Sequence, residues 1–287
     1  MLELLASEPA LFALVATLLG LLVGSFLNVV IHRLPHMMQR DWREQCAWID
    51  GKEVAAEAPY NLVIPRSACP SCQHPIAWYE NIPVLSWLAL RGRCSQCGAP
   101  ISKRYPLVEM LTGVLFGYAA WRWGVGMQTL LAWGLLASLV ALSCIDLDTQ
   151  LLPDGITLPL AWVGLLVNLN GLFCPLDQAV IGAVAGYISL WSVYHLFKLL
   201  TGKEGMGFGD FKLLAALGAW LGWQMLLPIV LAASFAGALI GIGFIVFAGH
   251  DRAKPMPFGP WLALGGLIAL FWGEDILHLW LGTSGVA

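Results

Sequence analysis

Long apolar runs without a charged residue constrain this chain more than any other feature of its sequence. A helix that crosses the hydrocarbon core of a bilayer needs about 20 mostly apolar residues. Because several runs reach this length, we predict that the chain crosses a membrane more than once. Runs that contain no Asp, Glu, Lys or Arg cover residues 9–31, 123–145, 155–175, 178–197 and 255–273.

Two further segments bring the predicted number of membrane helices to about eight. The run 213–249 is about twice the required length, so we expect it to hold two helices, hinged near Gly222 and Trp223. The segment 106–121 is interrupted by a single acid, Glu109. Only 11% of the residues are charged, which is less than half of the roughly 25% found in globular chains. The sequence therefore predicts an all-α polytopic membrane protein.

The distribution of basic residues predicts the orientation of the chain. Nine of the fifteen Lys and Arg residues lie between Arg33 and Arg104, and cytoplasmic segments carry such an excess. With eight spans, both termini then lie on the outer side of the membrane, which in a bacterium is the periplasm. The first run follows Glu3 and Glu8 and lacks a basic n-region, so we expect a retained helix and not a signal peptide. The net charge of −3 gives no basic surface for nucleic acid.

Three parts follow from this topology: a first transmembrane helix (1–32), a cytoplasmic insert (33–105) and a transmembrane domain (106–287). The insert carries two C-x-x-C pairs, and two such pairs supply the four thiolates that a tetrahedral zinc ion prefers. We predict a structural zinc ion, because the insert is too small for a large core. Cys46, Cys144 and Cys174 have no partner at ligand spacing, and His74 is expected to be a surface residue. The predicted zinc ligands are Cys69, Cys72, Cys94 and Cys97.

Acidic residues at the ends of the apolar runs are the candidate functional groups of the transmembrane domain. Asp146, Asp148 and Asp154 follow the run 123–145, and Asp210 closes the sequence Gly-Met-Gly-Phe-Gly-Asp before the next long run. Acids in membrane helices are costly, so each of them is a functional-site hypothesis. The topology places all four near the cytoplasmic face, where Asp146 and Asp210 can meet across a helix interface.

Two carboxylates that share a site of low polarity can divide the roles of base and acid. One stays ionised and activates a water molecule, while the other holds a proton and polarises the scissile carbonyl. We therefore predict that Asp146 and Asp210 cleave peptide bonds without a covalent intermediate. Asp148 is expected to be solvated, and Asp154 to cap the helix that starts near Ile156. The sequence has no G-x-S-x-G or H-E-x-x-H motif, so it does not support a serine protease or a zinc protease.

In order along the chain, these motifs resemble those of the type IV prepilin peptidases. Residues 24–35 read Gly-Ser-Phe-Leu-Asn-Val-Val-Ile-His-Arg-Leu-Pro, like the N-terminal signature of that family. After the C-x-x-C pairs come Arg-Tyr-Pro-Leu-Val-Glu at 104–109, Ile-Asp-Leu-Asp-Thr-Gln-Leu-Leu-Pro-Asp at 145–154 and the glycine motif at 205–210. The resemblance covers nearly the whole chain. The membrane half is also similar to the G-x-G-D intramembrane aspartyl proteases.

The resemblance implies a bifunctional enzyme of the bacterial inner membrane with its active site on the cytoplasmic side. Such an enzyme removes the basic leader of type IV prepilins, or of type II secretion pseudopilins, after a glycine. It then methylates the new N-terminal residue with S-adenosylmethionine. Family mapping places the catalytic pair on Asp146 and Asp210 and associates the cysteine insert with methyl transfer. No glycine-rich Rossmann turn is visible, so Glu109 and residues 24–35 are the candidates for the S-adenosylmethionine site.

Three rival functions remain open at this point. A peptidase without methyltransferase activity would use the zinc insert only for stability or for prepilin docking. A proton-coupled membrane transporter also places acids in its helices, although it would bury them near the bilayer midplane. A scaffold of the secretion machinery would need neither activity. The position of the acids at one face of the membrane favours a catalyst.

Overall fold

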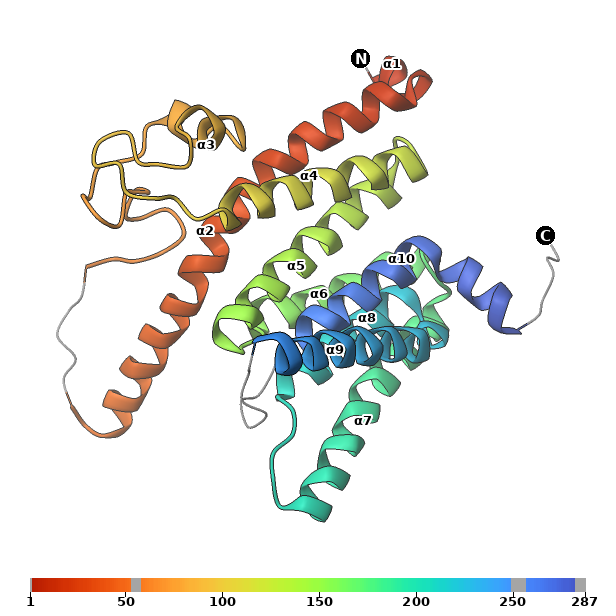
Figure 1. The fold of residues 1–287 in the computed structure, drawn as a ribbon. Coiled ribbons are helices and arrows are strands. Elements are labelled where there is room, and N and C mark those ends of the chain that lie inside the picture. The colour runs from red at the N-terminus through yellow and green to blue at the C-terminus, as the bar shows by residue number, and fades with distance from the viewer. Residues whose placement is uncertain (1, 53–57, 249–256, 282–287) are drawn as a thin grey trace. The chain divides into compact units, whose positions relative to one another are not determined.

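The computed structural model describes residues 2–52, 58–248 and 257–281 (Figure 1). Over these ranges all regular secondary structure is helical and there is no β-strand. Two isolated antiparallel bridges also occur. Residues 249, 255 and 256 of the predicted apolar runs lie outside the described ranges. The chain divides into two compact units, residues 1–141 and 142–287. Each unit is described by itself.

Eight long helices of the described residues match the predicted apolar runs, which confirms the all-α membrane architecture. Five helical segments are long and apolar enough to span a membrane by themselves: α2, α5, α7, residues 223–243 and residues 259–279. The other three, α4, α6 and α8, are shorter or less apolar. The eight helices are α2 (Pro9–Ile49), α4 (Arg104–Trp123), α5 (Met127–Thr149), α6 (Asp154–Val167), α7 (Leu176–Thr201), α8 (Phe208–Leu221), α9 (Leu226–Ala248) and α10 (Gly259–Leu281).

In the first unit, α2 and α4 pack side by side along a seam of glycines (Figure 1). A Cβ atom on Gly20 would lie 2.8 Å from the Gly113 Cα atom, and one on Gly24 would lie 2.7 Å from the Glu109 Cα atom. Small residues four apart let membrane helices approach closely, as in GxxxG pairs. α2 begins after the short helix α1 (Leu2–Ser7) and runs well past the predicted end of its apolar run, through Pro35 to Ile49.

The insert between α2 and α4 is mostly irregular. Its helical pieces are the single turn η1 (Trp78–Asn81) and the short α3 (Leu85–Ala89). The two isolated bridges pair Ala68 with Pro75 and Arg93 with Pro100, so each closes a small loop. The shape of the insert therefore depends on these loops and on the cysteines that they carry.

In the second unit, α8 is the central helix. From Asp210 to Leu221 nearly every side chain of α8 is buried, and its neighbours are α6, α7 and α10. The buried Asn168, in the turn η2 (Asn168–Asn170), donates hydrogen bonds to the carbonyl oxygens of Ala219 and Trp220 at 2.9 and 3.0 Å. These bonds fix the C-terminal end of α8, and with it the direction in which the helix presents its first turn.

The predicted hinge near residue 222 is confirmed. Gly222 ends α8 with a φ of +84°, a left-handed conformation that glycine adopts without strain. The turn η3 (Trp223–Met225) then leads into α9. The long apolar run is therefore two helices, as its length required.

Candidate functional site

Asp146 lies near the C-terminal end of α5 with only 4% of its surface exposed. The backbone N–H of Gly259, the first residue of α10, donates a hydrogen bond of 2.9 Å to its Oδ2 atom. The N-terminal end of a helix carries a partial positive charge, which stabilises a nearby carboxylate. The structure thus holds this buried acid in one orientation by means of a helix that follows much later in the sequence.

Asp210 lies in the first turn of α8, and it is 7% exposed. Its Oδ1 atom is buried and has no hydrogen-bond partner among the described residues. Buried polar atoms are nearly always hydrogen-bonded, so an unpaired one calls for an explanation. Binding of a water molecule or a substrate carbonyl by this oxygen would explain why it is unpaired.

Asp146 and Asp210, the predicted pair, lie near each other in the structure. Asp146 is near enough to act electrostatically on the Asp210 carboxylate. Leu152 packs against Gly209, which precedes Asp210, and against Gly259, which donates to Asp146. A Cβ atom on Gly209 would lie 2.7 Å from the Leu152 Cβ atom, and one on Gly259 would lie 3.1 Å from Leu152 Cδ2. Two buried carboxylates in such proximity form the kind of pair that can act as general base and general acid on a peptide bond.

The other two acids of the cluster have different surroundings. Asp148 is exposed. The expectation that Asp154 caps a helix is wrong, because Asp154 is itself the first residue of α6 and Pro153 takes the cap position. The Asp154 carboxylate instead accepts hydrogen bonds from Lys212 Nζ at 2.6 and 2.8 Å. This ion pair joins the start of α6 to α8 near the site without entering it.

A methyl group at Gly259 should damage this arrangement. The Cβ atom of Gly259→Ala would lie 2.6 Å from Asp146 Oδ2, so the carboxylate or the start of α10 must shift. If the site is catalytic, we expect peptide cleavage to fall roughly ten- to a hundredfold, since small misplacements of a reacting group have effects of this size. The initial rate of peptide cleavage measures it. Gly155→Ala, in the first turn of α6 with no neighbouring atom within 4 Å, is the matched control and should leave the rate unchanged.

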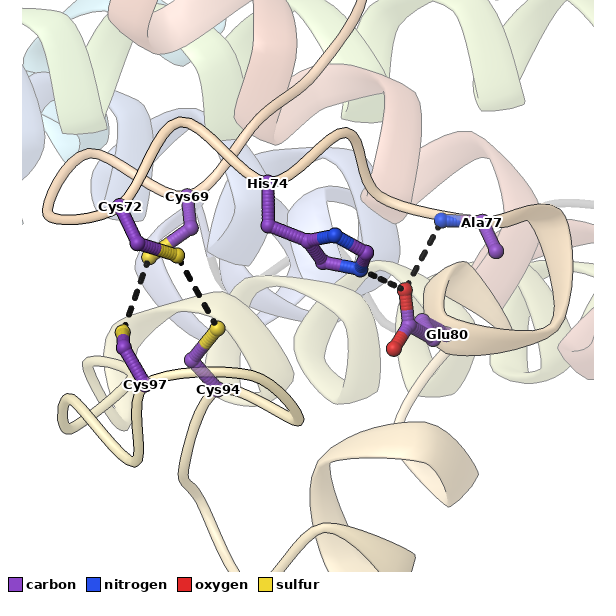
Figure 2. A network of polar contacts seen from close by, with 7 residues as sticks. All are labelled: Cys69, Cys72, His74, Ala77, Glu80, Cys94 and Cys97. Atoms are coloured by element: carbon purple, nitrogen blue, oxygen red, sulfur yellow. Dashed lines mark hydrogen bonds and ion pairs between the residues drawn. The ribbon is translucent and has the colours of Figure 1, made fainter.

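The four predicted zinc ligands converge in the insert (Figure 2). Their Sγ atoms all lie within 4.8 Å of one another. The two shortest contacts join one cysteine of each pair: Cys69 to Cys97 at 3.8 Å, and Cys72 to Cys94 at 3.9 Å. In a tetrahedral site with a Zn–S distance of about 2.3 Å, neighbouring sulfur atoms lie about 3.8 Å apart. The spacing therefore fits a single tetrahedral ion.

Two copies of one local structure present these cysteines. In the first loop the Cys69 N–H donates to the His74 carbonyl at 2.9 Å, and in the second the Cys94 N–H donates to the Ala99 carbonyl at 2.8 Å. The residue after the second cysteine has a positive φ in both loops: +59° at Gln73 and +70° at Gly98. The matching geometry indicates a two-loop metal site of the zinc-ribbon kind.

The chemistry of the donor set also fits a cation. Backbone N–H groups of Cys72 and Ser71 lower the pKa of the Cys69 thiol to about 6, so this ligand ionises readily. The pKa of Cys72 rises to about 12: the His74 backbone lowers it, but desolvation and the neighbouring cysteine sulfurs outweigh that effect. Four thiolates this close need a positive charge among them, and a divalent metal ion supplies it.

Glu80 connects the two cysteine loops. A hydrogen bond with the Ser95 side chain, the N–H of Ala77 and the nearby His74 hold the pKa of Glu80 below its usual range. Its Oε2 atom lies 2.9 Å from the Ala77 nitrogen and 3.4 Å from His74 Nε2 (Figure 2). His74 belongs to the first loop and Ser95 to the second. Glu80 thus contributes to the alignment of the loops, while His74 points to Glu80 and not to the sulfur atoms.

Comparison with known proteins decides the family. A profile of the Bacterial Peptidase A24 N-terminal domain matches residues 18–123, and one of the Type IV leader peptidase family matches residues 133–242. A Prepilin leader peptidase/N-methyltransferase of Stutzerimonas stutzeri is 56% identical over 97% of both chains. The chain belongs to the type IV leader peptidase family. Two further proteins of the same name are similar to this peptidase over nearly their whole length. The one from Pseudomonas aeruginosa is 54% identical over 99% of both chains, and the one from Aeromonas hydrophila is 56% identical over 98% of both. No solved structure shows a significant match.

Some contacts of this leader peptidase family member could not be read from its motifs. The N–H of Gly259 that holds Asp146 lies 113 residues along the chain, and only its place at the start of an apolar run signals a helix N-terminus. Glu80 stands between the two cysteine pairs, which is the one signal that could have singled it out. Glu109, a candidate for the S-adenosylmethionine site, is buried and accepts a hydrogen bond from the Val84 N–H at 2.8 Å.

Proposed function

We propose that this membrane protein is a prepilin leader peptidase that also N-methylates its product, as the names of its relatives indicate. It would cleave the basic leader from type IV prepilins, or from type II secretion pseudopilins, after a glycine. It would then transfer a methyl group to the new N-terminal residue. The observation that carries the peptidase activity is the buried pair Asp146 and Asp210, with one carboxylate oxygen left unpaired.

The proposed cleavage needs only these two carboxylates and a water molecule. One acid, ionised, takes a proton from the water as it attacks the scissile carbonyl. The other, protonated, donates to the carbonyl oxygen and stabilises the charge that develops there. A coupled pair of this kind titrates as a unit, so the proton belongs to the pair. The N–H of Gly259 holds Asp146 in place through both steps.

The cysteine insert and the methyl donor complete the proposal. Zinc would be held by the four cysteines and would supply a fixed cross-link between the two loops. S-adenosylmethionine would supply an electrophilic methyl group to the amine that cleavage exposes. The basic residues between Arg33 and Arg104 support a cytoplasmic position for the insert and the active site. With eight spans, both termini would lie in the periplasm, and the protein in the bacterial inner membrane.

Mass spectrometry of a model prepilin tests both activities. The purified enzyme is incubated with the prepilin, with and without S-adenosylmethionine. We expect the leader to be removed under both conditions, and the product to be heavier by one methyl group only when S-adenosylmethionine is present.

Each other outcome rejects a specific part of the proposal. Cleavage without a methyl group would leave a peptidase and reduce the insert to a structural element. No cleavage by a folded preparation would reopen the transporter hypothesis, which requires that Asp146→Asn abolish a flux. The enzyme without prepilin and the prepilin without enzyme are the two controls.

A further inference from the structure

One segment of the polar insert exposes several large apolar side chains. Residues 78–89, named here the apolar strap, comprise η1, α3 and the link between them. Apolar groups of this size gathered on an exposed surface mark contact with another protein or with a membrane. The exposed side chains of the strap are Trp78 (80%), Leu85 (65%), Tyr79 (58%), Leu88 (58%) and Ile82 (39%).

The packing of α4 against α2 sets the depth of the neighbouring residues in the membrane. Glu109 on α4 is level with Gly24 on α2, since a Cβ atom on Gly24 would lie 2.7 Å from the Glu109 Cα atom. Gly24 lies inside the uncharged run 9–31, and the next charged residue of α2 is Arg33. Nine residues of helix separate Gly24 from Arg33, which is roughly 13 Å along the axis. On α4, five residues separate Glu109 from Arg104, roughly 8 Å, so the Glu109 backbone lies just inside the edge of the apolar band.

A hydrogen bond ties the strap to this level. The Val84 N–H donates to Glu109 Oε2 at 2.8 Å. Val84 has a φ of +61°, a strained conformation for a β-branched residue that persists only where the surroundings impose it. Irregular backbone at membrane depth also requires that its polar groups be paired with protein. The Glu109 carboxylate meets this requirement for the Val84 N–H.

The face of α4 that points away from Glu109 is apolar and exposed. Leu107, Met110, Leu111 and Val114 are all exposed on α4, at 60%, 45%, 44% and 64%. On a helix that packs against a membrane-spanning partner, such side chains face lipid. The helix to which Val84 is hydrogen-bonded, in its second turn, thus carries lipid-facing side chains at the same level.

We propose that the apolar strap lies in the cytoplasmic interface of the bilayer, with its exposed side chains in contact with lipid. Trp and Tyr prefer this interface, and the leucines extend toward the acyl chains. The exposed Arg91 and Arg93, just after α3, are placed to meet anionic headgroups. The inference goes beyond the proposed function and does not depend on it. It makes the insert a part of the membrane surface and not a free cytoplasmic module.

The native chain contains a matched pair of tryptophans that tests this proposal. Trp48, near the end of α2, is 83% exposed and Trp78 is 80% exposed, so water reaches both equally in the absence of lipid. We would oxidise the wild-type protein with hydroxyl radicals in nanodiscs of phosphatidylethanolamine and phosphatidylglycerol, without prepilin. Lipid excludes water from its apolar layer, so oxidation of Trp78 should be at least about fivefold lower than that of Trp48. Equal oxidation would overturn the proposal.

A photo-crosslinker identifies what covers the strap. Benzoylphenylalanine in place of Leu88 should form adducts with phospholipid upon illumination of the full-length protein in the same nanodiscs. The same group in place of Gln96, an exposed residue of the second cysteine loop, should form none. Adducts of residue 88 with another part of the chain, or protection of Trp78 that appears only after prepilin is added, would replace lipid by a protein partner and refute the inference.

Discussion

Asn at either position 146 or 210 is expected to abolish leader cleavage by the full-length protein. The loss should be roughly a thousandfold or more, since general acid–base catalysis by one group contributes about 10²–10⁴-fold and the two acids act as a unit. Asn keeps the size of Asp, and at position 146 its carbonyl oxygen can still accept the Gly259 N–H. It cannot ionise or deliver a proton. The initial rate of leader removal from a model prepilin measures the effect.

A stability measurement separates this loss from misfolding. A buried carboxylate costs free energy that a neutral amide does not, so Asp210→Asn should unfold at the same temperature as the wild-type protein or at a higher one. Asp148→Asn changes an exposed acid of the same cluster and should retain most of the cleavage. Cleavage by Asp210→Asn at a rate near that of the wild type would show that the peptide bond is cut by other groups.

Loss of the metal from the cysteine insert is the second large expected effect. Cys69→Ser combined with Cys97→Ser removes one ligand from each loop and breaks a contact of 3.8 Å between the loops. Structural zinc sites contribute on the order of 10–16 kcal/mol to the folding of small domains. We therefore expect the variant to lose one zinc ion per chain and the order of its insert. Methyl transfer should vanish with it, while cleavage, which depends on the second unit, should persist.

Metal analysis of protein purified without chelator, together with the mass of the prepilin product, checks this expectation. Cys46→Ser is the control, because Cys46 is exposed and stands apart from the four ligands. It should keep both the zinc and the methyl transfer. Intact protein without bound metal would refute the zinc site. Normal methylation by the double variant would separate the metal from that activity.

The sequence predicts this fold well where one local property decides the structure. The length of uncharged runs identifies the membrane helices. The double length of 213–249 requires a break, and the break lies at Gly222. The extent of α2 could not be predicted in this way. Hydropathy ends with the apolar run, whereas hydrogen bonding of the helix continues past Pro35 into a polar segment that no longer shows an apolar pattern.

Local motifs likewise identify the acids and the cysteines but not what holds them. Asp210 can be predicted from its glycine motif. The unpaired state of its Oδ1 atom cannot, because it depends on how other helices pack against α8. Asp154 shows the opposite case. Its position before an apolar run is typical of a cap. The Asp154 carboxylate instead accepts a hydrogen bond from Lys212, which lies 58 residues later in the chain. Partners so distant in sequence have no local signal.

The hydrogen bond between Gly259 and Asp146 also bears on when the site forms during synthesis of the chain. Its donor belongs to α10, the last helix of the described residues, and its acceptor lies 113 residues earlier. A nascent chain that has reached only α9 contains both acids but not the group that orients the first of them. The ribosome must therefore synthesise the chain through the start of α10 before this hydrogen bond can form. If these acids are the catalytic pair, the order of synthesis delays proteolysis until α10 has joined the helices made before it.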